Sequence, residues 1–211
     1  DPELTLSCPE TATISSGADA LVHCVEAFSV KTANIYAKMF AKEAFRLLFH
    51  NLPKVIENLN DLDARGKVLL GAHFAGVATS NSGGAGLSGT MTYPLGGVFK
   101  VPHGIAGGIF LPKIIRYNFD KGFRGYSELY DVIENSNQQF SSEEKNKAFV
   151  EKIEMLCVKI KIPTKLSIFG IDKDKVDFLT NYLFDNLMAS VKNSPVEITK
   201  EDMKKILGGM F

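Results

Sequence analysis

Apolar residues recur at intervals of three and four along most of the chain, and this spacing constrains the fold more than any other feature. One set falls on a single helix face and comprises Ala18, Leu21, Val22, Val25 and Phe28. Strict alternation of apolar and polar residues, which is typical of a half-buried strand, is nearly absent. The pattern therefore predicts an all-α fold.

The periodic segments predict about nine helices, packed as a bundle-like domain. Pro53 is expected to kink or break the second helix near its end, because proline lacks the helical N–H donor. The third helix is expected to be buried almost all round in its second half. Capping-box spacings at Ser141 with Glu144 and at Thr199 with Asp202 mark two later helix starts. After the first helix, the expected ranges are about 34–55, 62–79, 103–117, 127–135, 141–162, 172–190 and 199–207.

The chain is predicted to form one domain over residues 1–211. Its 211 residues are 45% apolar and 23% charged, which excludes a disordered or fibrous chain. It contains no internal repeat, no low-complexity tract and no long linker.

Charge and cysteine content narrow the classes of partner and compartment. Lys plus Arg (24) equals Asp plus Glu (24), which argues against nucleic acid or a membrane surface as a partner. Three cysteines without a C-x-x-C pair favour a reducing compartment, so we expect a cytoplasmic protein. No stretch has the length of a membrane span, and the residues from Asp1 lack signal-peptide features. The chain also lacks an initiator methionine, so we expect it to begin within a longer gene product.

Asp19 and His23 form the first candidate site. They are four residues apart, so on a helix their side chains share one face at a Cβ separation of roughly 6 Å. A carboxylate and an imidazole suit Zn²⁺ or Fe²⁺. The alternative is a capping box of Ser16 and Asp19, which needs no metal.

His103 is the second candidate. Pro102 suits a first helical position, so His103 is expected in the first turn, where the helix dipole disfavours the imidazolium form. A neutral ring can ligate a metal or polarise a carbonyl, and the alternative is an ordinary packed or exposed histidine. His50 and His73 are interpreted as structural.

The segment from Gly84 to Gly89 spells G-x-G-x-x-G, which is the dinucleotide-binding fingerprint only between a strand and a helix. A buried helical pattern precedes it here. We therefore interpret it as a turn at which two helices come close to the backbone.

The order of these motifs resembles the C-terminal helical domain of the iron-containing (group III) alcohol dehydrogenases. The resemblance covers essentially the whole chain, and its motifs include GADALVH at 17–23, YPLGG at 93–97, VPHG at 101–104 and IPT at 162–164. Family members pair this domain with an N-terminal α/β domain that binds NAD(P). The resemblance thus implies the C-terminal half of a two-domain enzyme, inactive by itself.

The family holds its metal with one Asp and three His. Asp19, His23 and His103 match three of these ligands, which implies an Fe²⁺ or Zn²⁺ site. The remaining ligand is a His five residues before the proline of the Pro-Leu-Gly motif, and that position is Gly89 in this chain. Three protein ligands still make a catalytic site if water fills the gap, with lower metal affinity.

The resemblance implies metal-assisted hydride transfer between an alcohol and NAD(P), with a small alcohol or aldehyde as substrate and the nucleotide domain as partner. It allows a homodimer. Tyr93 is expected near the nicotinamide, together with His103, and both are candidate catalytic and cofactor-binding residues.

The glycine at position 89 leaves two other hypotheses open. In the first, Tyr93 and His103 donate hydrogen bonds to the carbonyl in a metal-independent reductase. In the second, the domain is a non-catalytic helical interaction module.

Overall fold

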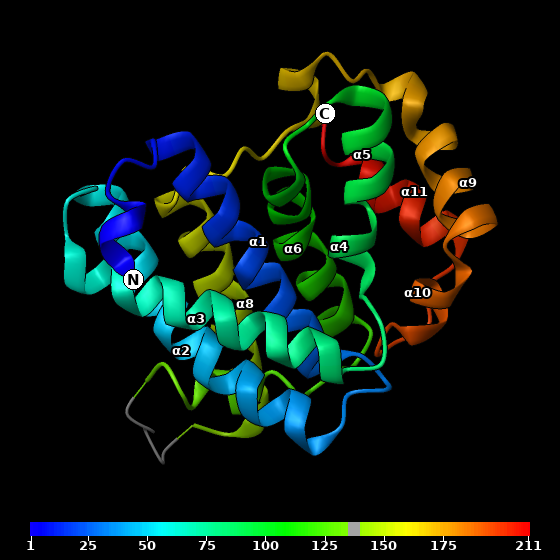
Figure 1. Ribbon diagram of the computed structural model, residues 1–211. Coiled ribbons are helices and arrows are strands. Elements are labelled where there is room, and N and C mark those ends of the chain that lie inside the picture. Colours follow the sequence, from blue (N-terminus) through cyan, green and yellow to red (C-terminus); the bar gives the residue numbers. More distant parts are fainter. Residues whose placement is uncertain (135–139) are drawn as a thin grey trace.

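The computed structural model describes residues 1–134 and 140–211, and every regular element within them is helical (Figure 1). The longest helices are α1 (Glu10–Ser29), α2 (Ile35–Glu57), α3 (Leu62–Asn81), α6 (His103–Asp120) and α8 (Ser142–Lys159). The all-α prediction is confirmed. The shorter elements are η1 (Pro2–Thr5), α4 (Leu87–Thr90), α5 (Thr92–Phe99), α7 (Ser127–Tyr130), η2 (Leu166–Phe169), η3 (Lys173–Lys175), α9 (Val176–Asn186), α10 (Met188–Asn193) and α11 (Lys200–Gly208).

Helix α1 runs through the middle of the molecule and packs against α2, α3, α4 and α6 (Figure 1). Figure 1 shows α2 and α3 on one side of α1, with α5, α9, α10 and α11 on the other. Thirteen of the 20 residues of α1 are buried, which explains why the apolar pattern of this helix is the clearest in the sequence. The central position of α1 allows one helix to carry residues that face several neighbours.

A cluster of buried aromatic rings connects α2, α6 and α8. The Phe149 ring of α8 stacks on Tyr126 at 5.0 Å between centroids and meets Phe45 of α2 at 5.3 Å. The buried Tyr126 hydroxyl accepts a hydrogen bond from Asn118 Nδ2 of α6 at 2.8 Å. These contacts hold α2, α6 and α8 in fixed positions, and α6 in turn positions the candidate site.

The helix-start signals were largely correct. Both predicted capping boxes are confirmed, at Ser141 with Glu144 and at Thr199 with Asp202. The Thr199 hydroxyl and backbone N–H lower the pKa of Asp202 to about 2.

Several helix predictions were wrong. Leu69 and Leu70 in α3 are 41% and 46% exposed, because α3 packs only one side against α1 and α2, so its second half is not buried all round. Pro53 lies inside α2, which continues to Glu57, so of the two expected effects the break does not occur, whereas a kink at Pro53 stays a prediction.

About nine helices were expected, and the described residues contain eleven α-helical segments, of which α4, α7 and α10 are short. Helix α5 was not predicted. The segment expected as one helix over 172–190 divides into η3, α9 and α10, with a break at Leu187 (φ −129°, ψ 30°). The helix expected over 127–135 is only the short α7, and residue 135 lies outside the described residues.

None of the described helices is both long and apolar enough to cross a membrane.

Candidate metal centre

Asp19 and His23 lie one turn apart on α1. Asp19 Oδ1 is 3.8 Å from His23 Nε2, as the four-residue spacing predicts. The alternative capping role of Asp19 is wrong, because α1 begins at Glu10 and Ser16 already lies inside the helix. There the Ser16 hydroxyl donates to the carbonyl of Ala12 at 2.9 Å. The Asp19 carboxylate is therefore not used to cap a helix.

His103 joins this pair from a segment at least 80 residues further along the chain. It is the first residue of α6, directly after Pro102, so the prediction of a first-turn position is confirmed. Its Nε2 lies 3.5 Å from Asp19 Oδ1. One ligand atom of each of Asp19, His23 and His103 lies within 4.8 Å of the other two.

Gly104 makes this approach sterically possible. A Cβ at position 104 would stand 1.8 Å from the carbonyl oxygen of Ser15 and 3.0 Å from Asp19 Cβ. Only glycine can bring the start of α6 so close to the α1 backbone. The glycine of the Pro-His-Gly motif therefore places His103 beside Asp19.

The three side chains fit a divalent cation in donor chemistry, and the two distances from Asp19 also fit in spacing. Two imidazoles and one carboxylate are typical of non-haem Fe²⁺ and catalytic Zn²⁺ sites with open positions. Ligands at 2.0–2.2 Å from one cation are at most about 4.4 Å apart, and the distances from Asp19 Oδ1 to both histidines lie within that limit. The His103 side chain is 57% exposed, so one side of the cluster is open to a substrate.

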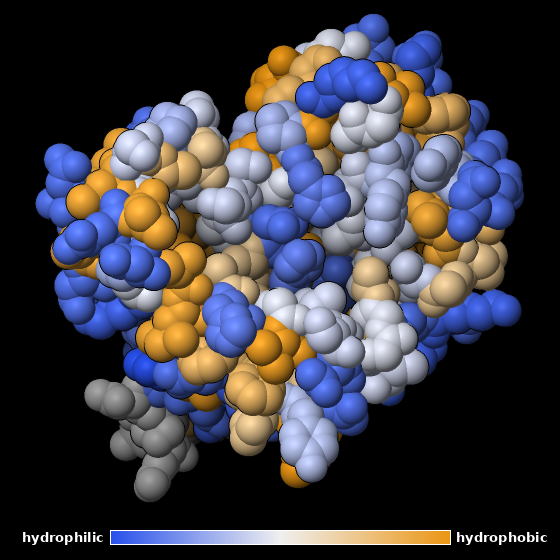
Figure 2. Space-filling model, in the orientation of Figure 1, coloured by the Kyte–Doolittle hydropathy of each residue, from blue (hydrophilic) through white to orange (hydrophobic). Residues whose placement is uncertain are grey.

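A cavity of about 160 Å³ adjoins this cluster. Tyr93, at the start of α5, lies on the cavity wall with His23 and His103 and is 57% exposed. Figure 2 shows hydrophilic side chains gathered near the middle of this face, between the α3 side and the α5 side. The structure thus brings together Asp19, His23, His103 and Tyr93. His50 and His73 are exposed and lie outside the cluster.

Gly89 also lines the cavity and presents only backbone to it. A Cβ at this position would meet Glu26 Oε2 at 2.9 Å and Val22 Cγ1 at 3.7 Å. Position 89 therefore lies on the wall of the cavity beside the candidate centre and supplies no side-chain ligand.

Glu26 is the residue of this region that the sequence analysis missed. Its buried carboxylate accepts backbone N–H groups from Gly86 (3.1 Å), Ser88 (2.5 Å) and Gly89 (3.2 Å). Burial outweighs these hydrogen bonds and raises the pKa of Glu26 to about 7. The signal that could have found it is its position three residues after His23, which places both near one helix face.

The glycine-rich segment from Gly84 is a turn between helices, as predicted. Its first half, Gly84 to Gly86, follows α3 and forms the turn, and its second half lies in the four-residue α4. The described part of the chain has no strand that could make it a Rossmann loop. Gly83 adopts φ +78°, a left-handed conformation that favours glycine. The carboxylate of Glu26 ties this turn to α1, the helix that carries Asp19 and His23.

Comparison with known proteins identifies a family and several relatives of the chain. Residues 13–211 match the model described as "Fe-containing alcohol dehydrogenase family, C-terminal". The long-chain-alcohol dehydrogenase 1 of Geobacillus thermodenitrificans is 30% identical over 211 residues, covering 100% of this chain and 53% of that protein. The chain thus spans about half the length of the curated relatives it matches.

Solved structures show the same fold. A 1,3-propanediol oxidoreductase superimposes with a TM-score of 0.92 at 26% identity, covering 100% of this chain and 55% of its own. Sulfoacetaldehyde reductase from Bifidobacterium kashiwanohense, in complex with NAD⁺, gives a TM-score of 0.86 at 27% identity, covering 100% of this chain and 53% of its own.

Proposed function

Because the chain belongs to the iron-containing alcohol dehydrogenase family, we propose that it forms the metal- and substrate-binding part of an NAD(P)-dependent alcohol dehydrogenase or aldehyde reductase. The observation that carries the proposal is the convergence of Asp19, His23 and His103 beside an open cavity. Relatives named as alcohol dehydrogenases and as lactaldehyde reductase support both directions of the reaction.

Asp19, His23 and His103 would hold Fe²⁺ or Zn²⁺. When bound, such a cation supplies Lewis-acid polarisation of the alcohol or aldehyde oxygen. Asp19 contributes the one negative charge of the cluster, which favours a divalent cation over an uncharged ligand. Gly104 and the α1 backbone keep the ligand atoms at fixed positions, which reduces the reorganisation required for binding.

Tyr93 and His103 face the open side of the cavity, where a substrate and a nicotinamide would meet. The Tyr93 hydroxyl would donate a hydrogen bond to the substrate oxygen and so stabilise charge that develops on it. The cofactor itself, NAD or NADP, would be held mainly by a separate nucleotide-binding domain, as the relatives' greater length suggests.

A metal-independent reductase is the second candidate, and Gly89 is the observation that favours it. Four ligands at this centre would require a side chain at position 89, where Glu26 leaves no space for a Cβ without movement. In this case Tyr93 and His103 alone would polarise the carbonyl by hydrogen bonding.

Aldehyde reduction by the full-length gene product, before and after chelation, distinguishes the candidates. We expect NADH or NADPH oxidation to stop after chelation and to return with Fe²⁺ or Zn²⁺. Activity that survives complete metal removal would support the metal-independent reductase. Absence of turnover, metal binding and nicotinamide binding would instead indicate a non-catalytic module.

A further inference from the structure

A second cavity, of about 360 Å³, adjoins the cavity beside the candidate metal centre. The two cavities share Gly84 and Ala85, so the turn after α3 forms part of both walls. From His23 to Ser29, the last residue of α1, the helix rises by about 9 Å at 1.5 Å per residue. Lys31 follows two residues later and lines the second cavity. The second cavity therefore continues from the first toward the C-terminal end of α1.

The second cavity carries a net positive charge. Lys31 and Lys192 line it, and none of its lining residues in the described part of the chain is acidic. Neither lysine forms an ion pair among residues 1–134 and 140–211. Lys31 Nζ instead donates to the backbone carbonyl of Lys192 at 3.3 Å. Because no carboxylate neutralises the two ammonium groups, the cavity favours an anion over a neutral or cationic ligand.

Asn193 supplies an oriented hydrogen-bond donor to the same cavity. The residue is only 9% exposed, and its Oδ1 accepts the backbone N–H and the hydroxyl of Thr32 at 3.2 and 2.9 Å. Its Nδ2 therefore points away from Thr32, and it donates to no residue in the described ranges, yet it is not enclosed by protein atoms. Nδ2 lies 2.9 Å from the point at which a Cβ of Gly84 would stand, so the glycine leaves this donor accessible on the cavity wall.

We propose that the second cavity binds the carboxylate end of an aldehyde substrate whose carbonyl group lies in the cavity beside the candidate metal centre. The carboxylate accepts a hydrogen bond from Asn193 Nδ2, and the charges of Lys31 and Lys192 compensate its own. The substrate class is thus an ω-oxo carboxylate, with the aldehyde at one end and the carboxylate at the other. Reduction adds a hydride from NAD(P)H to the carbonyl carbon and a solvent proton to its oxygen, and leaves the carboxylate unchanged. The position of the aldehyde rests on the proposed function, whereas that of the carboxylate rests on the second cavity alone.

Binding of hexanoate to the 211-residue chain, measured by calorimetry or ligand-observed NMR, tests the carboxylate position without any reaction. Hexanamide has the same size without the charge. We expect it to bind at least about tenfold more weakly, because hydrogen bonds to charged groups are stronger than those to neutral groups. Equal binding of the two probes, or no saturable hexanoate binding at millimolar concentrations, would overturn the proposal.

Three variants and one control assign the binding to this cavity. Lys31→Met and Lys192→Met each remove one charge and should weaken hexanoate binding about fivefold. Asn193→Asp keeps an oxygen to accept from Thr32 but replaces the N–H donor with a second oxygen, so we expect a loss of at least about tenfold. Lys147→Met makes the same change at an exposed lysine that lines neither cavity and should leave binding unchanged. Unchanged affinity in folded Lys31→Met and Lys192→Met would contradict the assignment even if Asn193→Asp fails to fold.

The full-length gene product tests the substrate class. Its kcat/KM for ω-oxo carboxylates, from 4-oxobutanoate to 8-oxooctanoate, is compared with that for the unsubstituted aldehyde of each length. We expect a preference of at least about tenfold for the carboxylate at one or more lengths, and the double variant Lys31→Met, Lys192→Met to abolish it. Reduction of unsubstituted aldehydes without this preference would overturn the inference and leave the proposed function intact. If the protein reduces no aldehyde but binds hexanoate through the two lysines, the anion site is confirmed and the proposed function is contradicted.

Discussion

The carboxylate of Glu26 occupies the space beside Gly89 into which a side chain would extend. Glu26 Oε2 lies 2.9 Å from the point at which a Cβ of residue 89 would stand, and both carboxylate oxygens accept the Gly89 N–H at 3.2 Å. The glycine at this position and the buried acid are therefore sterically coupled. A fourth protein ligand at position 89 requires Glu26 to move.

Substituting Gly89 tests this coupling. Gly89→Ala should lower the free energy of unfolding by about 1–3 kcal/mol, because three N–H donors restrain the Glu26 carboxylate that the new methyl group would contact. Gly97→Ala is the matched control. No atom lies within 4 Å of its Cβ position in α5, so it should be neutral or stabilising by up to about 1 kcal/mol. Urea denaturation measures both, and equal stability of the two variants would argue against the coupling.

Glu26 should make the metal-free chain less stable as pH rises. Its pKa in the folded chain, about 7, exceeds the ordinary value of 4.5, so the folded state binds its proton more tightly than the unfolded state. The stabilisation is complete below about pH 4.5 and is lost as pH rises to about 7.

Glu26→Gln removes this titration while keeping the size of the side chain. Between pH 4.5 and 7, the unfolding free energy of the wild type should therefore fall relative to that of Glu26→Gln. Urea denaturation in EDTA measures both values. A difference that stays constant over this range would show that Glu26 keeps an ordinary pKa.

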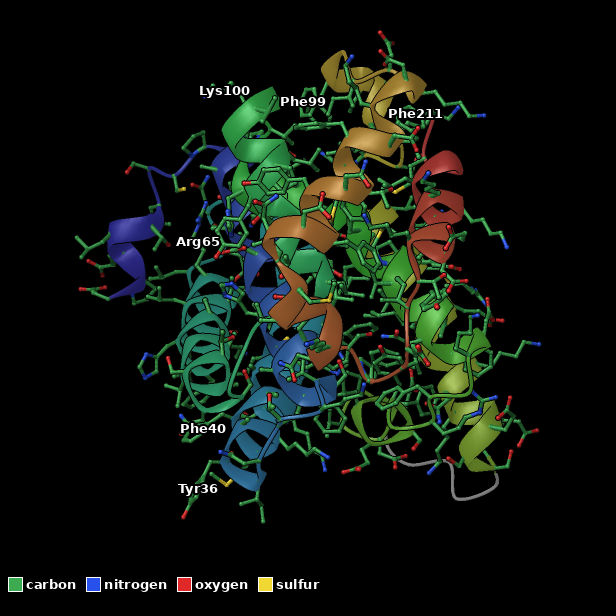
Figure 3. The ribbon with its side chains drawn as sticks, turned by 90° about the vertical axis from the view of Figure 1, so that its right-hand side faces the viewer. Tyr36, Phe40, Arg65, Phe99, Lys100 and Phe211 are labelled. Carbon is green, nitrogen blue, oxygen red and sulfur yellow. The ribbon has the colours of Figure 1, made fainter. Side chains whose placement is uncertain are left out.

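Tyr93→Phe should reduce kcat/KM of the full-length gene product for aldehyde reduction. If a bound cation also stabilises the negative charge on the substrate oxygen, we expect kcat/KM to fall about tenfold. In the metal-independent reaction it should fall about 100- to 1,000-fold, which is the usual cost of removing one hydrogen-bond donor from an oxyanion. Tyr36→Phe is the matched control, since Tyr36 is 63% exposed and projects outward at the start of α2 (Figure 3). An unchanged kcat/KM in Tyr93→Phe would exclude a hydrogen-bonding role.

The sequence was sufficient for the parts of the site that depend on local geometry. The four-residue spacing of Asp19 and His23 places them on one helix face, and the proline before His103 marks a helix start. Their convergence was implied by resemblance to the family. The physical cause, visible only in the structure, is the contact of Gly104 with the Ser15 backbone.

Features that depend on long-range contacts could not be read from the sequence. The partners of Glu26 are backbone groups 60 to 63 residues away, and no side-chain pattern encodes them. The apolar composition of α3 indicated burial, but the packing of neighbouring helices decides which side is covered, so Leu69 and Leu70 are exposed.

Metal binding by the 211-residue chain tests the central claim most directly. Co²⁺ titration of the metal-free chain, followed by visible absorption and calorimetry, should show one site. Asp19→Asn and His103→Ala should each weaken it by at least about tenfold, because even indirect partners of a metal contribute 10- to 100-fold. His73→Ala, which removes an exposed histidine outside the cluster, should leave the affinity unchanged. Absence of one-to-one binding, or equal affinity in His103→Ala and His73→Ala, would contradict a metal centre at Asp19, His23 and His103.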